Sequence, residues 1–398
     1  MWYTGRMQWT FVTSGFPWPL TSGTWLRVFH QARALLAGGD SVRILCRSRG
    51  DDAPGLAAYA DAGVEVVRIE TPEPPIRPRH ALGVCVFDGE FAPVVAQWAK
   101  QSDVMVLVNP GALQYAPEAR ACKRVIADLG DDPILEERRK LFGDLRPGAF
   151  LRRLKFCWGF DRDARRYCRD VDTVVMVSET DRVSFARRHR KVSVETVPGG
   201  VDVNYFSQTP VAAPEAQPTI YFPGNFAHPP NRDAAELLAT KIAPVLRKSV
   251  PDLRVVLLGA NSPESWEKIK SEHLIVTGFV DDMRDWMAAS HAVILPMRIG
   301  TGVKNKLLEA WAARRPVIAT TLSTQGIAAE AGENLLVADG AEAMADAVQK
   351  ILQNSILASK LADNGYETVM RDHSWEAVAR CYRRIACGPS HRNECAMS

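Results

Sequence analysis

The sequence lacks the features of several common protein classes. It has no run of about 18 apolar residues, so no membrane-spanning helix is predicted. Its eight cysteines form no C-x-x-C pair and no Cys/His cluster with zinc spacing, so no metal site is predicted. The N-terminal segment has no signal-peptide apolar core, and scattered thiols are typical of a reducing compartment. We therefore expect a cytoplasmic protein.

A strong charge of one sign is absent as well. The 398 residues include 49 Lys and Arg and 46 Asp and Glu, which gives a formal net charge of +3. This balance does not by itself indicate a nucleic-acid partner. The contents of 46% hydrophobic and 24% charged residues are those of an ordinary globular protein, and the length suits two domains.

Short apolar segments alternate with amphipathic segments along the chain. The first apolar segment is Trp9–Ser14, followed by a Gly- and Pro-rich loop and a helical pattern over Thr24–Ala37. Most later apolar segments are rich in β-branched residues and apolar on both faces, which indicates buried parallel strands. Strand–helix alternation of this kind predicts an α/β fold with doubly wound sheets.

One segment interrupts the alternation and divides the chain. Ser207–Pro218 (SQTPVAAPEAQP) is rich in Pro and Ala and predicts a linker. We expect a Rossmann-like domain over residues 1–206, a second one over 207–371, a helix over 372–388 that returns to the first domain, and a disordered tail over 389–398. Ligands of open parallel sheets bind at the carboxyl ends of the strands, so two such domains facing each other would enclose a central cleft.

A glycine-containing loop in the second domain predicts a phosphate site. In the segment PMRIGTGVKNKLLEAWAARRPVIATT (296–321), an apolar strand ends and a helix is predicted to open near Val303. Gly300 and Gly302 allow the backbone to approach a ligand closely. The start of a helix offers unpaired N–H groups and the positive end of the helix dipole, both of which favour phosphate.

Three charged residues follow these glycines. Lys304 and Lys306 add positive charge near the predicted helix start, and Glu309 lies less than two turns into the helix. A carboxylate there can accept two hydrogen bonds from a ribose diol, each worth roughly 1.5–3 kcal/mol. The alternative is a solvated loop with two surface lysines and one surface glutamate. The segment is not a Walker A motif, because no Gly-Lys-Ser/Thr follows Gly300 at the required spacing.

These residues resemble the donor-site signature of glycosyltransferase family 4. The stretch GTGVKNKLLEAWAARRPVIATTLSTQGI resembles the bacterial branch that reads G-x-G-x-K-x-K-x-x-E-A. Further segments are similar to other parts of the family, namely 12–27, 172–181, 197–206, 221–225, 276–296 and 372–375. The resemblance covers nearly the whole chain and is most specific over 276–327.

The resemblance implies a GT-B fold, a nucleotide-sugar donor, retention of configuration at the anomeric carbon and no required metal. The domain over 1–206 would bind the acceptor and the domain over 207–371 the donor. The implied donor-binding residues are Gly23, Gly224, Asn225, Phe279, Val280, Gly300, Gly302, Lys306 and Glu309, and the implied catalytic residues are Lys304, Asp128 and Thr301. Glu309 would bind the ribose, the backbone of Phe279 and Val280 the base, and Lys304 the leaving diphosphate.

The sequence departs from the family pattern at three places. The E-x7-E pattern needs a glutamate at position 301, where Thr301 stands. An Arg and a Lys often follow the strand that opens the second domain, but here the chain reads GNFAHPPN, with Asn225 at the Arg position. A histidine expected after the fifth strand of the first domain is replaced in RVIADLGDD. Asp128 there is either a contact to sugar or acceptor or a capping or turn aspartate.

A basic stretch lies in the first domain. Residues Arg138–Arg169 contain eleven Lys and Arg against three Asp, with apolar and aromatic residues between them. This pattern predicts an acceptor-side or membrane-surface patch that attracts anionic lipid or another polyanion. A peripheral position at the inner membrane face is then expected. The alternative is a solvated helix face whose aromatic residues pack inward.

Taken together, the motifs favour a retaining glycosyltransferase. We expect it to move a sugar from a UDP- or GDP-linked donor to an acceptor hydroxyl on a glycan, a lipid-linked molecule, a small molecule or another acceptor. One alternative keeps the fold for a sugar-nucleotide epimerase or phosphorylase, and another is a nucleotide-sugar-binding protein without catalysis. An NAD-dependent oxidoreductase is disfavoured, because no G-x-G-x-x-G follows the first strand.

Overall fold

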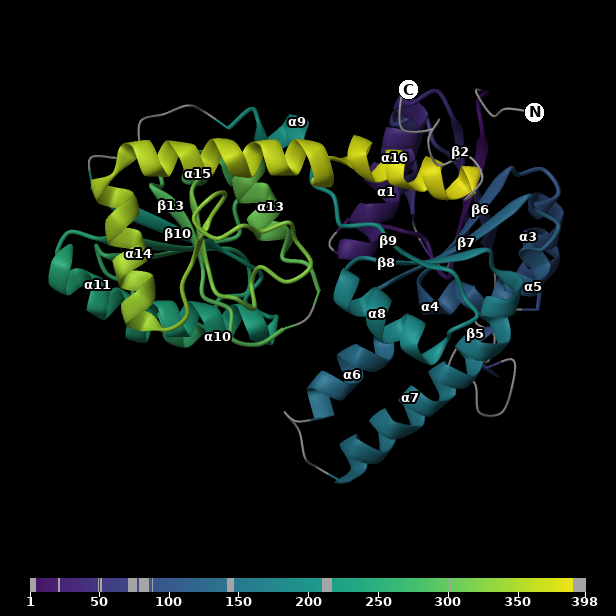
Figure 1. Cartoon of the computed structure of the whole chain (residues 1–398), viewed down its shortest axis with the longest axis horizontal. Coiled ribbons are helices and arrows are strands. Elements are labelled where there is room, and N and C mark those ends of the chain that lie inside the picture. Colours follow the sequence, from purple (N-terminus) through teal and green to yellow (C-terminus); the bar gives the residue numbers. More distant parts are fainter. Residues whose placement is uncertain are drawn as a thin grey trace. The chain divides into compact units, whose positions relative to one another are not determined.

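The computed structural model of the chain consists of two compact units, shown in Figure 1. It describes residues 5–20, 22–48, 50, 52–70, 77–78, 86–87, 89–141, 147–209, 217–300 and 302–388. Unit 1 comprises Met1–Pro198 and Val378–Ser398, and unit 2 comprises Gly199–Ala377. The chain therefore leaves unit 1 after Pro198 and returns to it within the last helix, α16 (Trp375–Cys387).

Unit 1 contains a seven-stranded sheet in the order β3-β2-β1-β6-β7-β8-β9. Its strands are β1 (Gln8–Thr13), β2 (Ser41–Ser48), β3 (Glu65–Glu70), β6 (Val104–Val108), β7 (Arg124–Gly130), β8 (Thr173–Met176) and β9 (Val194–Thr196). All neighbouring strands of this sheet are parallel. A separate antiparallel pair is formed by β4 (Arg77–Pro78) and β5 (Val86–Phe87). The central strands are buried on both faces, as their continuous apolar sequence predicts.

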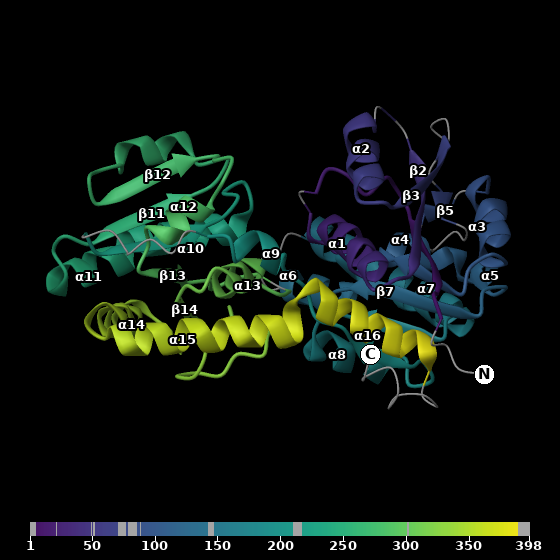
Figure 2. The ribbon, with the colours of Figure 1, turned by 90° about the horizontal axis from the view of Figure 1, so that it is seen from above.

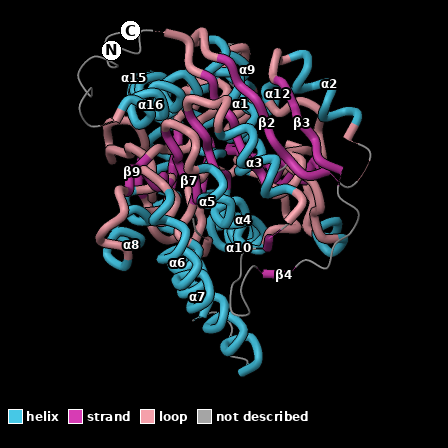
Figure 3. The backbone as a smooth tube through the Cα atoms, turned by 90° about the vertical axis from the view of Figure 1, so that its right-hand side faces the viewer, coloured by secondary structure: helices cyan, strands magenta, loops and turns pink. Residues whose placement is uncertain are grey.

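Helices cover both faces of the sheet of unit 1. They are α1 (Gly23–Ala37), α2 (Ala53–Asp61), α3 (Phe91–Ala99), α4 (Asn109–Ala112), η1 (Leu113–Tyr115), α5 (Ala116–Ala119), α6 (Pro133–Leu141), α7 (Pro147–Tyr167), η2 (Cys168–Asp170) and α8 (Glu179–Arg188). Ser22 caps α1 by accepting a hydrogen bond from the Trp25 amide. The helices α6 and α7 pack on each other, and α7 extends beyond the layers of unit 1 (Figure 3).

Unit 2 repeats this architecture with six parallel strands in the order β12-β11-β10-β13-β14-β15. The strands are β10 (Thr219–Pro223), β11 (Arg254–Leu258), β12 (Leu274–Gly278), β13 (Ala292–Leu295), β14 (Val317–Ala319) and β15 (Leu336–Val337). The helices are α9 (Val203–Phe206), α10 (Pro229–Leu237), η3 (Leu238–Ile242), α11 (Ala243–Ser249), η4 (Glu264–Lys268), α12 (Arg284–Ala288), α13 (Asn305–Ala312), α14 (Ala341–Gln353), α15 (Ser355–Thr368) and η5 (Val369–His373). In Figure 2, α15 lies beside α13 and α14, against which it packs.

The predicted α/β fold with two doubly wound parallel sheets is confirmed. Parts of the predicted linker, residues 210–216, and the tail predicted to be disordered, residues 389–398, lie outside the described residues. The predicted start of the helix near Val303 is wrong by two residues, because Lys304 keeps an extended backbone (φ −91°, ψ 90°) and the helix begins at Asn305. None of the helices formed by the described residues is both long enough and apolar enough to span a membrane.

Candidate functional site

The sheet topology of unit 2 marks one edge as the place for a ligand. From β10 the chain continues outward through β11 and β12, and then returns to the other side of β10 to form β13. The carboxyl ends of β10 and β13 therefore flank the point where the strand order reverses, which is where open α/β sheets bind ligands. The loops that leave these two ends begin at Gly224 and Pro296.

The loop after β13 requires glycine at two positions. Gly300 has φ +117° and Gly302 has φ +71°. Residues other than glycine rarely adopt a backbone conformation with positive φ. A Cβ atom on Gly300 would also lie 3.3 Å from Pro230 at the start of α10. The structure thus brings the two predicted glycines next to the loop after β10. Thr301 between them lies outside the described residues.

Lys304 occupies the N-cap position of α13. The Lys304 side chain makes no capping hydrogen bond to the first turn, so it leaves the first-turn N–H groups available to a ligand. Lys304 is only 7% exposed, and its Nζ donates a hydrogen bond of 2.7 Å to the carbonyl oxygen of Gly302. The ammonium group is therefore held against the glycine loop, which places a full positive charge at the positive end of the helix dipole.

Lys306 lies two residues after Lys304, in the first turn of α13, and is half-buried. Its Nζ donates a hydrogen bond of 2.6 Å to Oδ1 of Asn231 and lies 4.7 Å from the centre of the Phe222 ring. Burial lowers the pKa of Lys306 to about 8, a shift that Glu309 opposes and Lys304 reinforces. This lysine is therefore poised to change its charge when an anion binds nearby.

Glu309 follows Lys306 by three residues on α13, so the two side chains share one face of the helix. The Glu309 side chain is half-buried rather than in bulk solvent. Burial raises the pKa of Glu309, and the neighbouring Lys306 works against this shift. Glu309 also contributes to the raised pKa of Tyr221, a buried residue of β10, after the larger effect of burial. The carboxylate thus lies between the start of α13 and β10.

The loops after β10 and β11 touch each other through their backbones. Gly259 has φ +147°, and a Cβ atom there would lie 1.8 Å from the carbonyl oxygen of Gly224. Asn225 bridges the same loops, because its Oδ1 accepts a hydrogen bond of 3.0 Å from Asn261. The Asn225 carbonyl accepts a hydrogen bond of 2.9 Å from Asn231, which in turn binds Lys306. Asn225 is therefore connected to the lysine side of the site.

The turn after β12 carries the predicted base-binding residues. Gly278 has φ +75°, the Phe279 side chain is 76% exposed, and Val280 packs against the core of unit 2. The end of this turn is held by contacts among three side chains, those of Tyr205, Asp282 and Arg284. Tyr205 donates a hydrogen bond of 3.0 Å to Asp282, and the Arg284 guanidinium lies 4.3 Å from the centre of the Tyr205 ring. Hydrogen bonds from Arg284, despite the opposing effect of burial, hold the pKa of Asp282 far below its usual value.

The sequence interpretation missed this Tyr205–Asp282–Arg284 cluster. Its members lie up to 79 residues apart along the chain, as in the contact of Arg284 with the Tyr205 carbonyl. The D-D-x-R spacing before α12 is compatible with a local ion pair, but no sequence signal indicates that Tyr205 joins it.

In unit 1, Asp128 is buried and already paired. Its side chain is 4% exposed, and its Oδ2 accepts hydrogen bonds from Nε of Arg27 at 2.9 Å and from the Tyr382 hydroxyl at 2.5 Å. Arg27 further donates to the carbonyl oxygens of Val197 and Pro198. Asp128 therefore ties β7, α1 and α16 together. This arrangement favours a structural role for Asp128. Its contact with sugar or acceptor stays a prediction.

Gly23 is the first residue of α1, directly after the N-cap Ser22. It lies in unit 1, whereas the other predicted donor residues lie in unit 2. Within unit 2 the structure brings together the loops and helix that carry Gly224, Asn225, Gly300, Gly302, Lys304, Lys306 and Glu309. The turn with Phe279 and Val280 follows β12, two strands away from β10 in the same sheet.

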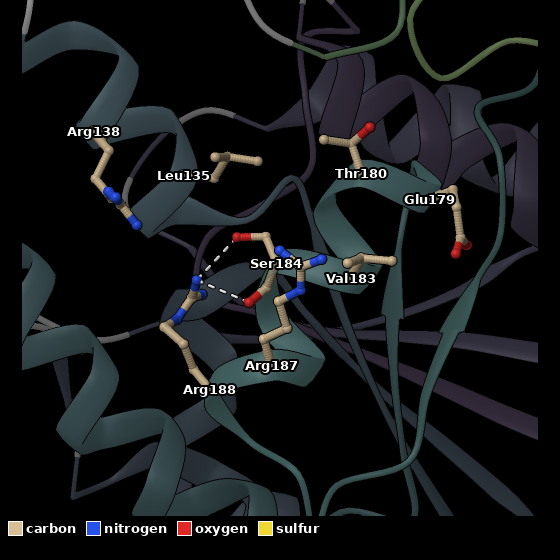
Figure 4. A pocket seen from close by; sticks show the side chains of 8 residues that line it. All are labelled: Leu135, Arg138, Glu179, Thr180, Val183, Ser184, Arg187 and Arg188. Carbon is tan, nitrogen blue, oxygen red and sulfur yellow. Dashed lines mark hydrogen bonds between the residues drawn. The ribbon is translucent and has the colours of Figure 1, made fainter.

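A pocket of about 700 Å³ lies between α6 and α8 of unit 1 (Figure 4). Three arginines, Arg138, Arg187 and Arg188, and one acidic residue, Glu179, line it together with small polar and apolar residues. Nη1 of Arg188 donates hydrogen bonds of 3.0 Å to the carbonyl and the hydroxyl of Ser184. The exposed Arg138 and Arg187 form no ion pair with a described residue, so this pocket carries net positive charge. The sequence placed Arg138 in the basic stretch but gave no sign of a pocket.

Within the described part of the chain, no three His, Cys, Asp or Glu side chains gather into a group that would suit a metal ion.

The chain is similar to known glycosyltransferases, most clearly in unit 2. Residues 217–354 match the family described as Glycosyl transferases group 1. The chain is 28% identical over 207 residues to a phosphatidyl-myo-inositol mannosyltransferase of Mycobacterium leprae (strain TN), covering 49% of this chain and 54% of that protein. It is 31% identical over 110 residues to the lipopolysaccharide core biosynthesis glycosyltransferase LpsE of Rhizobium meliloti (strain 1021), covering 27% and 32%. The chain thus spans about half, or less, of the length of these relatives.

Solved structures extend the similarity to the fold of the whole chain. The structure of Anabaena Alr3699/HepE in complex with UDP and glucose superimposes with a TM-score of 0.65 at 13% identity, covering 96% of this chain and 100% of that chain. The similarity over 217–354 is therefore to a group 1 glycosyltransferase model, and the chain has the GT-B fold.

Proposed function

We propose that this protein is a retaining, metal-independent glycosyltransferase that uses a UDP- or GDP-linked sugar. Unit 2 binds the donor and unit 1 binds the acceptor. The observation that carries this proposal is the constellation at the switch point of unit 2. There, two positive-φ glycines, two lysines and an uncapped helix start lie beside a half-buried carboxylate.

The constellation matches the chemical groups of a nucleotide-diphosphate sugar. The glycine loop lets the backbone approach the diphosphate, and the first-turn N–H groups of α13 with Lys304 bind its oxygens. Glu309 accepts hydrogen bonds from the two ribose hydroxyls, and the exposed turn at Phe279 and Val280 receives the base. The raised pKa of Glu309 fits a carboxylate that lacks its hydrogen-bond donors until the ribose arrives.

In the proposed reaction, the bond between the anomeric carbon and the leaving phosphate oxygen breaks. The acceptor oxygen forms the new bond on the same face of the sugar, and the acceptor proton passes to an oxygen of the leaving diphosphate. The negative charge that develops on the diphosphate is stabilised by Lys304, by Lys306 and by the dipole of α13. No side chain is required as a strong general base, in keeping with the burial and pairing of Asp128.

The comparisons support a nucleotide-sugar donor. The similar HepE structure holds UDP and glucose, which favours testing UDP-glucose first. A relative named for mannosyl transfer makes GDP-mannose the second choice. One relative is named as a phosphatidyl-myo-inositol mannosyltransferase and the other for lipopolysaccharide core biosynthesis, which supports a lipid-linked acceptor. We also propose that Arg138–Arg169 provides contact with an anionic membrane or another polyanion.

The experiment is a screen of UDP- and GDP-sugars by thermal shift, followed by mass spectrometry of reactions with candidate acceptors. We expect one donor to stabilise the protein and to be consumed with a sugar-mass increase on the acceptor, with EDTA leaving the rate unchanged. Interconversion of donor sugars without acceptor would instead support the epimerase alternative, and donor release by inorganic phosphate the phosphorylase. Donor binding without turnover across all acceptors would support a non-catalytic binding protein.

A further inference from the structure

Four large hydrophobic side chains are exposed close together on α7. Phe150 is 41% exposed, Leu151 65%, Leu154 50% and Trp158 57%. Among the described residues, only six other large hydrophobic side chains are exposed to this degree, and they are scattered over unit 2. An exposed apolar cluster on one helix indicates a surface that meets something other than water.

Helical geometry places these residues on one side of α7. Leu151, Leu154 and Trp158 follow one another at spacings of three and four residues, so they form a stripe along the helix. The opposite side of α7 packs into unit 1 through residues such as Phe160, Ala164 and Tyr167, which are buried. The exposed stripe therefore does not belong to the core of unit 1, and the alternative in which all the aromatic residues pack inward is wrong for Trp158.

The same exposed side of α7 is basic. Lys155 and Arg162 continue the stripe, Arg152 and Arg166 flank it, and Arg169 follows in η2, all of them exposed. None of these five cations forms an ion pair with a described residue. The aspartates of α7, Asp161 and Asp163, are half-buried and buried, and Asp161 pairs with Arg165 at 2.8 Å. The exposed side thus combines apolar residues with uncompensated positive charge.

A hollow of about 630 Å³ accompanies the stripe. Leu151, Leu154 and Trp158 line it together with Ile134 and Cys157, so its wall is mostly apolar. One basic residue, Lys155, and one acidic residue, Asp161, complete the lining. The helix α7 extends beyond the layers of unit 1 (Figure 3), in keeping with the exposure of Leu151, Leu154 and Trp158.

We propose that the exposed side of α7 binds the surface of a membrane that contains anionic lipids. Leu151, Leu154 and Trp158 enter the boundary between head groups and acyl chains, where tryptophan is favoured, and Lys155, Arg152 and Arg162 contact lipid phosphates. This surface combines exposed apolar residues on one side of the helix with cations beside them. A nucleic-acid site differs, because its affinity comes mainly from phosphate contacts. The proposed transferase function enters this proposal only as the reason for membrane binding, which would bring the enzyme to a membrane-bound acceptor.

The test is sedimentation of the full-length protein with vesicles of equal parts phosphatidylcholine and phosphatidylglycerol, and with vesicles of phosphatidylcholine alone. We expect binding to the anionic vesicles that falls at least tenfold in the variant Leu154→Glu/Trp158→Ser. The variant Arg152→Glu/Arg162→Glu should lose binding to a similar extent. Both sets of residues are exposed, so circular dichroism should show an unchanged fold.

Matched changes in unit 2 serve as controls. Ile356 is 83% exposed on α15, and Lys241 and Lys248 are exposed on η3 and α11. The variants Ile356→Glu and Lys241→Glu/Lys248→Glu should bind vesicles like the unmodified protein. Nucleotide affinity, measured by calorimetry on every variant, should not change, so that loss of vesicle binding is separated from any failure of the donor site.

Two outcomes would overturn the proposal. One is vesicle binding that is absent, or equal for all variants. The other is binding that falls with the charge reversal but not with Leu154→Glu/Trp158→Ser, because the surface would then recognise polyanions through charge alone. Neither outcome bears on the proposed donor chemistry, which the nucleotide titration tests separately.

Discussion

Binding of a nucleoside diphosphate should be accompanied by proton uptake at Lys306. In the empty site the pKa of Lys306 is lowered to about 8, chiefly by burial. A phosphate group close to a buried cation favours its charged form and raises its pKa by roughly 1–3 units. Above pH 8 the neutral amine of Lys306 must therefore take up a proton from the solvent when UDP or GDP binds.

The size of the effect follows from these values. With a pKa near 8 in the empty site and roughly two units higher in the complex, the uptake near pH 8.5 is about 0.7 proton per site. Near pH 7 the lysine is already mostly charged, and the uptake falls to about 0.1 proton on the same reasoning. Proton uptake that rises steeply between pH 7 and pH 8.5 would therefore identify Lys306 as the residue that takes up the proton.

Calorimetry in two buffers with different ionisation enthalpies measures the uptake directly. The variant Lys306→Met keeps the length of the side chain but removes the ammonium, and it should abolish the uptake near pH 8.5. The variant Lys248→Met, on the exposed surface of α11, should leave the uptake unchanged. Equal proton uptake by the unmodified protein and Lys306→Met would refute the reasoning, as would the absence of uptake despite nucleotide binding.

Three further predictions concern single residues. Lys304→Ala should lower turnover at least tenfold while changing the affinity for the free nucleoside little, because its charge faces the diphosphate; equal losses in both would contradict this role. Gly259→Ala should destabilise unit 2 by about 2 kcal/mol or more in urea unfolding, because the added Cβ meets the Gly224 carbonyl and φ is +147°; an unchanged midpoint would argue against that backbone contact. Asp128→Ala should cost about 3 kcal/mol of stability, because it leaves the Arg27 charge buried without its partner; loss of activity at full stability would instead restore a substrate role.

The sequence allowed the fold to be predicted because its strands are short, β-branched and apolar on both faces. Helical segments with one apolar face separate them, and this alternation has few solutions other than doubly wound parallel sheets. The predicted helix after β13 was right in kind but began two residues too early. The helix starts only after Lys304, whose backbone is extended and which follows two glycines with positive φ.

The donor site could be predicted where its residues are close in sequence. Gly300 through Glu309 lie within ten residues, so a short loop followed by the first turns of one helix keeps them close together. Contacts across the fold could not be predicted in this way. Arg27 and Asp128 are 101 residues apart, and only the packing of α1 against β7 brings them together. Likewise, the periodicity of α7 shows that it is amphipathic but does not show which side unit 1 covers.

The central claim is that the start of α13 and Glu309 bind a nucleotide-diphosphate sugar. Titration of UDP and GDP into Glu309→Ala, with pyrophosphate as the matched ligand that lacks a ribose, tests it most directly. Loss of one or two charge-assisted hydrogen bonds should raise the nucleotide Kd at least about tenfold, while the pyrophosphate Kd stays the same. Nucleotide affinity equal to that of the unmodified protein, in a variant that is correctly folded, would contradict the account.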